Sequence, residues 1–318
     1  MTAKRTGVGA AAVRSNGREG LPAVSLVPVP GRWRASLDLA CEIERRGFAG
    51  IYVPSLGDAM GFCEALALKT EVIPFGTSIV NIYTRHAYDY AQSAATIHEL
   101  SGGRFFFGVG VSHAPMNGFL GVRAGKPLAD MRAFVKAWRE APRVGERPPL
   151  VLAALRDPMV KLAGELADGV VFANAARSYL AHSLETFAQA CDGGDNAFFA
   201  DMIPTVVSDD RAAAAARNRK TMTSYAKLPN YRNYWKAAGY REEMEAIEAA
   251  VEAGRSESIP SLLSDRWLAD CTLFGSATQV REGIEAWRQA GLRTPIVVPS
   301  SASGNQMKAF EELFAAFA

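Results

Sequence analysis

The feature that most constrains the fold is a repeated alternation between short apolar runs and amphipathic segments. Several of the runs are apolar at nearly every position, as parallel strands covered on both faces are. Segments with the apolar spacing of helices lie between them. This alternation predicts an α/β protein, a (β/α)8 TIM barrel, with a doubly wound open sheet as the alternative. The eight predicted strands are 24–29, 50–54, 72–79, 104–111, 149–155, 169–174, 202–207 and 294–300.

One connection is longer than a simple crossover requires. Residues 208–275 include the aromatic-rich stretch TSYAKLPNYRNYWKAAGY, which predicts inserted helices before the last strand rather than a loop. The next helix begins at Ser276, which stands in capping-box spacing with Gln279, and ends before Gly291. We therefore expect a single barrel domain over 24–318 with a helical insertion at about 208–275.

Composition narrows the function classes. The chain has 318 residues, 49% of them hydrophobic, and a net charge of +2, so a large core is expected and nucleic-acid binding is not. The four cysteines are scattered without metal-ligand spacing, which indicates no metal site and a reducing, cytoplasmic location. No apolar run is long enough to cross a membrane. Residues 1–23 lack the apolar core of a signal peptide, and we expect a flexible tail there.

The stretch ELSGGRFFFGVGVSHAPMNGF, residues 99–119, divides into two halves. Its Ser-Gly-Gly-Arg segment precedes the fourth strand and is expected at the structural end of a barrel, with Arg104 bonding backbone carbonyls or a carboxylate. Gly108 and Gly110 supply only two glycines of a dinucleotide fingerprint, because His113 stands where the third would be. Gly110 and the residues after it are expected at the carboxyl end of the barrel, where a glycine permits close approach of a ligand.

Four segments carry a family resemblance: 76–112 (GTSIVNIYTRHAYDYAQSAATIHELSGGRFFFGVGVS), 149–175 (PLVLAALRDPMVKLAGELADGVVFANA), 273–292 (LFGSATQVREGIEAWRQAGL) and SYAKLPNYRNYWKAAGY in the insertion. With these segments the chain resembles the luciferase-like superfamily of flavin and deazaflavin oxidoreductases, and its insertion is most similar to the branch that depends on coenzyme F420. The resemblance implies a TIM barrel, a redox cofactor at the carboxyl end, and a homodimer. Coenzyme F420 is the expected cofactor, with FMN as the alternative.

The resemblance also implies where the cofactor is bound. The third strand matches a family motif with a non-prolyl cis peptide, which would join two residues that bulge against the cofactor ring. The segment after the fourth strand would meet the ribityl or phosphate part. The helix start after the fifth strand would hold phosphate, since helix N-termini attract anions. The expected cofactor-binding residues are Ser78, Ile79, Asn81, Gly110, Val111, Ser112, Ala154, Leu155 and Arg156.

Three residues are candidates for catalysis. Some relatives carry a histidine after the second strand, which is missing here, so Ser55 and Asp58 are the candidates to replace it. His113 is the best candidate for a general acid, because imidazole exchanges protons near neutral pH.

The expected function is hydride transfer between coenzyme F420 and a small organic substrate, because the cofactor carries the chemistry and the barrel orients it. One alternative is an FMN-dependent luciferase-like monooxygenase. Another is a non-catalytic barrel that acts as a binding or partner subunit, since the usual histidine is absent and Ala87 replaces a proline common in relatives. We expect neither a nucleic acid nor a membrane as partner.

Overall fold

The structure, a computed structural model, describes residues 20–191 and 197–318, so the expected N-terminal tail lies outside the described residues up to residue 19. Eight parallel strands form a closed barrel, because the order runs from β6 through β1 to β9 and β7, and β7 pairs again with β6. The TIM barrel is confirmed, and closure excludes the doubly wound open sheet. The barrel strands are β1 (Ala23–Ser25), β2 (Ile51–Val53), β3 (Phe75–Asn81), β4 (Phe105–Gly110), β5 (Leu150–Ala153), β6 (Gly169–Ala173), β7 (Phe198–Val207) and β9 (Thr294–Pro299).

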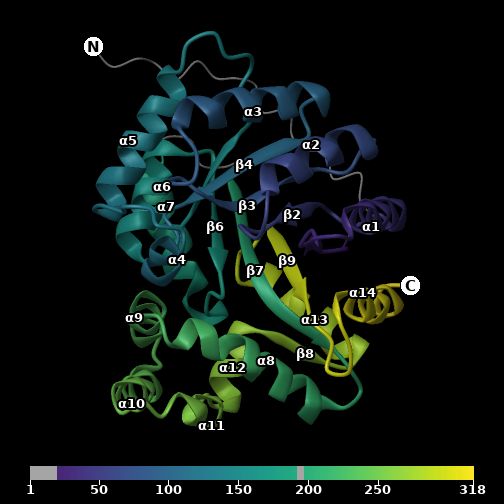
Figure 1. The fold of residues 1–318 in the computed structure, drawn as a ribbon. Coiled ribbons are helices and arrows are strands. Elements are labelled where there is room, and N and C mark those ends of the chain that lie inside the picture. Colours follow the sequence, from purple (N-terminus) through teal and green to yellow (C-terminus); the bar gives the residue numbers. More distant parts are fainter. Residues whose placement is uncertain (1–19, 192–196) are drawn as a thin grey trace.

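Helices cover the outside of the barrel (Figure 1). The predicted capping box is present at the start of one of them, where Ser276 and Gln279 each accept from the other's backbone. A further short helix, α4 (Ala114–Phe119), lies in the connection after β4. The covering helices are α1 (Trp33–Arg46), α2 (Ala59–Lys69), α3 (Ala87–Leu100), α5 (Pro127–Glu140), α6 (Asp157–Leu166), α7 (Leu180–Ala190), α13 (Ala277–Gln289) and α14 (Gln306–Ala316).

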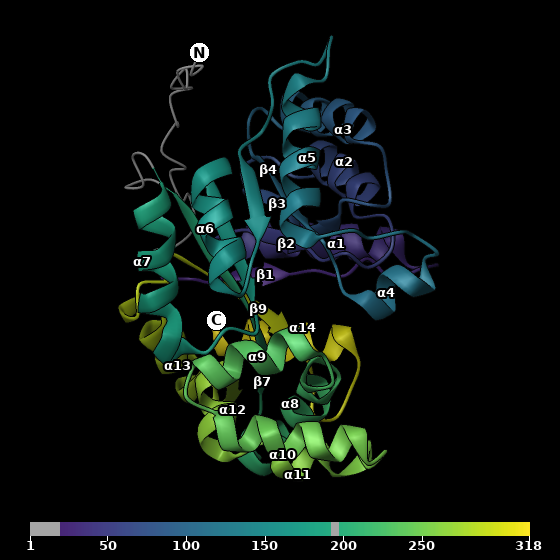
Figure 2. The same cartoon turned by 90° about the vertical axis from the view of Figure 1, so that its left-hand side faces the viewer.

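The segment after β7 is helical as expected, but it ends in an unpredicted strand. β8 (Leu273–Gly275) pairs with the last residues of β7, from Thr205 to Val207. Leu273 and Phe274 are the only apolar side chains of β8, and two positions are too few to distinguish a strand from the end of the preceding helical segment. Figures 1 and 2 both show the helices of this segment gathered away from α2, α3 and α5. They are α8 (Arg211–Ala226), α9 (Pro229–Ala237), α10 (Arg241–Glu252), α11 (Ile259–Leu262) and α12 (Asp265–Cys271).

The run of three phenylalanines in β4 serves two layers of the core. Successive side chains of a strand point to opposite faces, so Phe106 enters the barrel and its ring lies 5.1 Å from that of Phe198. Phe107 points outward instead and stacks on Trp138 of α5 at 5.7 Å. The apolar run therefore joins the barrel interior to the helical layer.

The residues before β4 are structural, as predicted. The Arg104 guanidinium donates to the carbonyl oxygens of Ser101, Ala67, Thr70 and Ile73 and to the Thr70 hydroxyl, at 2.8 to 3.2 Å. Arg104 thus joins the turn after α3 to the end of α2 at the amino end of the strands. The functional site is therefore expected at the opposite end, where the barrel strands have their carboxyl ends.

Over residues 20–191 and 197–318, none of the helices combines the length and the apolar character needed to cross a bilayer.

Candidate active site at the carboxyl end of the barrel

A cavity of about 130 Å³ opens at the carboxyl end of the barrel. Strand ends form its floor, and two helices of the insertion form its roof. The floor is mostly apolar, whereas the roof is aromatic and carries hydroxyl groups. The lining residues are Pro54, Ile79, His113, Ala173, Asn174, Met202, Pro204 and Val298 from the barrel, and Thr221, Tyr225 and Tyr231 from α8 and α9.

The third strand bulges where the cofactor contact is expected, but without a cis bond. The pairing of β3 with β4 slips between Thr77 and Val80, so Ser78 and Ile79 form the bulge. No peptide bond in the described residues is cis, so the expected cis bond between Ser78 and Ile79 is wrong. The extra residue of the bulge aims Ile79 into the cavity with a trans backbone. The Ser78 hydroxyl is buried without a hydrogen-bond partner.

Two glycines of β4 make room for this bulge rather than for a ligand. A Cβ at Gly108 would overlap the carbonyl oxygens of Thr77 and Ser78. A Cβ at Gly110 would lie 2.8 Å from the Ile79 Cγ2 atom and 3.1 Å from the Ala153 Cβ atom. The space that Gly110 leaves is therefore occupied by protein side chains. Its contribution to a ligand site is indirect, through the position of Ile79.

The segment after β4 is held by a chain of amide side chains. The Asn81 amide donates to the Asn117 Oδ1 atom at 2.8 Å, and the Asn117 amide donates to the Val111 carbonyl at 3.1 Å. Ser112 between them has a φ of 57°, a left-handed conformation that non-glycine residues seldom adopt. Such strained residues often lie at functional sites. The Asn81 Oδ1 atom also accepts a hydrogen bond from the backbone N–H of Tyr83, so both ends of its side-chain amide are already bonded within the protein.

His113 is the one candidate catalytic residue that lines the cavity. Its half-buried ring lies 5.5 Å from the ring of Tyr231 on α9. Burial lowers the pKa of the His113 imidazole, which favours the neutral ring at neutral pH. A neutral imidazole accepts a proton more readily than it donates one. His113 is therefore better placed as a base than as the general acid expected from the sequence.

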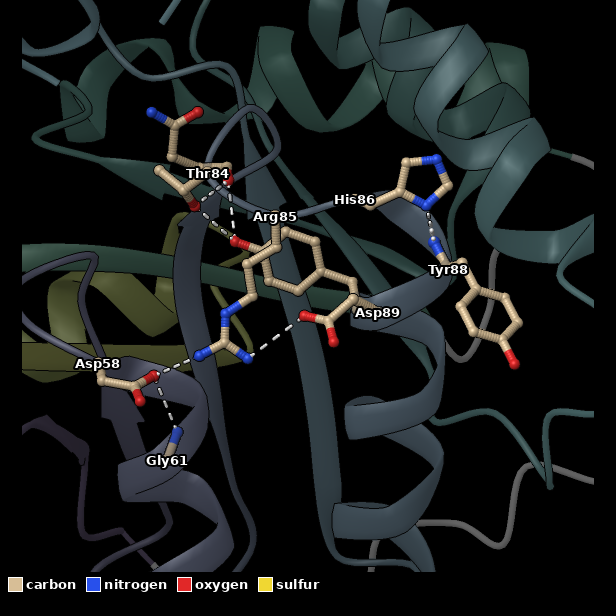
Figure 3. Close-up of polar contacts among 9 residues, drawn as sticks. Asp58, Gly61, Thr84, Arg85, His86, Tyr88 and Asp89 are labelled. Atoms are coloured by element: carbon tan, nitrogen blue, oxygen red, sulfur yellow. Dashed lines mark hydrogen bonds and ion pairs between the residues drawn. The ribbon is translucent and has the colours of Figure 1, made fainter. Parts of the chain in front are cut away.

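The other two catalytic candidates lie outside the cavity. Asp58 caps α2 by accepting from the Gly61 N–H at 3.1 Å, and it pairs with Arg85 at 2.8 Å (Figure 3). Arg85 also faces Asp89 at 3.7 Å. Ser55 is exposed in the loop after β2. The Asp58 carboxylate is thus used by a helix cap and an ion pair, two roles that compete with proton transfer.

The helix that was predicted to hold phosphate at its start, α6, begins at Asp157 with Pro158 in its first turn. Ala154 and Leu155 lead into it, and Arg156 stands at the N-cap position with an exposed side chain and no capping bond. Asp157 places an acidic group in the same first turn, and its Oδ2 atom lies 3.0 Å from the His182 Nε2 atom. Arg156 remains available to an anion, whereas Asp157 weakens the positive field there.

Sequence reasoning missed the polar groups of the cavity other than His113. Asn174 follows β6 with a φ of 59°, and its buried side-chain amide lies beside the Tyr225 and Tyr231 hydroxyls, whose pKa values it lowers against the effect of burial. Behind it, Asp201 is fully buried on β7 and accepts from the Ala175 N–H at 3.3 Å. Burial raises the pKa of Asp201 to about 7, with two backbone N–H groups partly opposing the shift. An asparagine directly after a buried strand was the one available signal, since Asn tolerates the left-handed conformation.

Comparisons with known proteins agree with the barrel fold. A Mycobacterium tuberculosis protein provisionally named as a coenzyme F420-dependent oxidoreductase is 26% identical over 281 residues, 74% of this chain and 81% of its own. The structure of coenzyme F420-dependent tetrahydromethanopterin reductase from Methanopyrus kandleri matches with a TM-score of 0.70 at 19% identity, over 93% of this chain and 97% of that one. An F420-dependent secondary alcohol dehydrogenase matches with a TM-score of 0.70 at 16% identity, over 94% and 99%. The family model for luciferase-like monooxygenases matches residues 11–294, and the chain therefore belongs to the luciferase-like monooxygenase family.

Proposed function

We propose that the protein is an oxidoreductase that transfers a hydride between coenzyme F420 and a small organic substrate. The observation that carries this proposal is the cavity at the carboxyl end of the barrel, which joins an apolar floor to a titratable group, His113. A protein of this family needs such a place for a flat redox ring and a proton. The names of similar proteins favour the deazaflavin over FMN.

The residues of the mouth fit a flat ring system. Ile79, Ala173, Met202 and Val298 form a floor without charged groups, and the alanine leaves space above the barrel. The unpartnered Ser78 hydroxyl stands beside this floor in the bulge. A volume of about 130 Å³ is smaller than the roughly 300 Å³ at which ligand pockets begin. We therefore expect α8 and α9 to move outward when the cofactor binds.

A bound deazaflavin would supply the carrier of the hydride, and the chain would supply orientation and proton transfer. The bulge at Ser78 and Ile79 would orient the ring from below. The aromatic roof would exclude water. Neutral His113 would accept a proton when the substrate is oxidised and, once protonated, return it in the reverse direction.

Arg156→Ala should weaken cofactor binding about fivefold, or about 1 kcal/mol, if the exposed guanidinium pairs with a cofactor phosphate. The control is Lys161→Ala, an exposed cation farther along the same helix. Dissociation constants for coenzyme F420 from fluorescence titration measure the effect. Equal constants for wild type and Arg156→Ala would assign Arg156 to the solvated surface.

The cofactor assignment is tested by titrating the protein with coenzyme F420 and, in parallel, with FMN. Saturable binding of coenzyme F420 alone is expected. Binding of FMN alone, with oxygen consumed by the reduced complex, would indicate a monooxygenase instead, because a deazaflavin reacts poorly with oxygen. Binding of neither would favour a barrel that acts through a partner protein.

A further inference from the structure

The loop after β6, residues 174–178, is bonded to the helices of the insertion, and we call it the latch loop. The Asn174 carbonyl accepts from the Trp235 indole at 3.1 Å, and the Ala176 N–H donates to the Tyr234 hydroxyl at 3.1 Å. Trp235 and Tyr234 both belong to α9, and both side chains are buried. Because α9 also forms part of the roof of the cavity, the roof cannot move outward without breaking these two bonds.

The far end of the latch loop is held by a carboxyl group of α12. The Asp270 Oδ1 atom accepts from the Ser178 N–H at 3.0 Å, and its Oδ2 atom accepts from the Ser178 hydroxyl at 2.6 Å. The Tyr240 hydroxyl donates to the same Oδ2 atom at 2.8 Å. Both oxygens of Asp270 therefore have hydrogen-bond donors, and this end of the loop is firmly fastened.

The near end of the latch loop lies against Asp201 of β7, a fully buried carboxyl group. The backbone N–H groups of Ala175 and Met202 are its donors, and the first lies 3.3 Å from the Oδ1 atom. Among the residues that the structure describes, no cation forms an ion pair with it. An ionised carboxylate would lose its hydration here without gaining a counter-ion. The closed arrangement of loop and roof therefore favours the protonated acid.

Asp201 titrates near neutral pH, whereas its tyrosine and cysteine neighbours do not. Burial raises the pKa of Asp201 to about 7, and the two backbone N–H groups oppose the shift. Burial also raises the pKa of Tyr231, Tyr234 and Cys271, and the Asp201 charge adds to each shift. These three groups therefore stay neutral from pH 5 to pH 8. The charged groups that act on the same cluster are Asp270 of α12, Glu243 of α10 and Arg177 of the 3₁₀ turn η1 (Arg177–Tyr179).

Outward movement of the roof changes the surroundings of Asp201. Two side chains of α9, Tyr231 and Tyr234, lie close enough to feel its charge, so withdrawal of α9 admits water to the carboxyl group. In water the pKa of Asp201 falls back toward its usual value of 3.8. Opening therefore releases a proton between these two pKa values, and a rising pH favours the open roof.

We propose that Asp201 is a proton-controlled latch of the insertion, whose protonated form holds the roof closed over the barrel mouth and whose ionisation lets α9 open. The opening itself is independent of the proposed function, whereas the control of cofactor entry rests on it. Since the cavity must widen to admit a cofactor, ionisation of Asp201 lowers the cost of binding.

Hydrogen exchange of the full chain without cofactor, followed by NMR from pH 5 to pH 8, tests the opening. The reporters are the amides of Ala175 and Ala176, which bond to Asp201 and to Tyr234. Their protection factors should fall by about tenfold to 100-fold in wild type as the pH rises, and stay constant in Asp201→Asn. Asp209→Asn, at an exposed position, is the control and should behave as wild type. The same fall in wild type and Asp201→Asn would overturn the proposal.

Global unfolding must be separated from opening of the roof. The amide of Phe107, which donates to the Pro149 carbonyl at 2.9 Å within the barrel, reports global unfolding. At pH 8 the amides of Ala175 and Ala176 should exchange faster than this barrel amide. Exchange at equal rates would mean that the latch loop opens only when the whole protein unfolds, and would overturn the proposal as well.

Titrations with coenzyme F420 at pH 5 and pH 8 connect the latch to the cavity. The ratio of the dissociation constants of Asp201→Asn and wild type should grow about tenfold or more between these pH values, because asparagine keeps the roof closed. The ionisations of the cofactor and of His113 are shared by both proteins and cancel in the ratio. A ratio that is independent of pH would overturn the control of cofactor entry. If the exchange results hold but coenzyme F420 binds at neither pH, the latch stands and the proposed function fails.

Discussion

Replacing Gly108 with alanine is expected to destabilise the protein by about 3 kcal/mol, because an added Cβ would overlap fixed backbone atoms. The Cβ would lie 2.8 Å from the Ser78 carbonyl carbon and still closer to the oxygens of Thr77 and Ser78. The Thr77 side chain joins the two strands here, since its hydroxyl donates to the Gly108 carbonyl at 2.8 Å and accepts from the Gly108 N–H at 2.9 Å. Neither strand can move without losing these bonds.

Urea unfolding of Gly108→Ala measures this effect. Gly118→Ala is the matched control, because an added Cβ there meets no atom within 4 Å. The control substitution lies in helix α4 and should leave stability unchanged or raise it slightly. Equal unfolding free energies for the two variants would show that β3 and β4 do not approach closely at the bulge.

Asp201→Asn is expected to gain stability relative to wild type as the pH rises, by about 2 to 3 kcal/mol between pH 5 and pH 8. In the folded protein burial raises the pKa of Asp201 to about 7, against 3.8 for the free side chain. Between these values the folded state keeps a proton that the unfolded state has lost. Unfolding therefore releases a proton, and wild-type stability falls with rising pH until it levels off above about pH 7. Asparagine resembles the protonated acid and does not titrate.

The measurement is the unfolding free energy of both proteins in urea from pH 5 to pH 8. The difference between the two curves isolates Asp201, because all other titrating groups are shared. Asp209→Asn, at an exposed aspartate after β7, is the control and should show no such trend. A constant difference between wild type and Asp201→Asn would mean that the carboxyl is ionised throughout.

The barrel could be predicted from the sequence because local rules and the global fold agree there. Several of the eight predicted strands are nearly continuous apolar runs, as parallel strands covered on both faces are. Their alternation with helical segments favoured a closed barrel of eight strands. The role of Arg104 followed from its place before a strand, and the helix start at Ser276 from its spacing to Gln279. In each case the interaction either joins residues close in sequence or lies at an end of the barrel that the position before a strand already identifies.

The details of the mouth could not be predicted, because they depend on contacts between distant segments. In the sequence Asp58 is a carboxylate in a loop. In the structure the pairing of β2 with β3 places Arg85 beside it, and the two form an ion pair. From the sequence Gly110 was expected to contact a ligand, but in the structure the Ile79 side chain fills the space beside it. Tyr231 packs against His113, which lies 118 positions earlier in the sequence. No local sequence pattern specifies where α9 packs in the folded chain, so this contact could not be predicted.

The most direct test of the central claim is to fill the barrel mouth and measure the dissociation constant of coenzyme F420. Ala173→Phe adds a ring where the cavity floor is open, and Ala133→Phe adds the same ring on the exposed face of α5. Both variants should fold. Loss of coenzyme F420 binding by at least tenfold in Ala173→Phe, with wild-type affinity in Ala133→Phe, is the predicted result. Wild-type affinity in Ala173→Phe would contradict the assignment of the barrel mouth as the cofactor site.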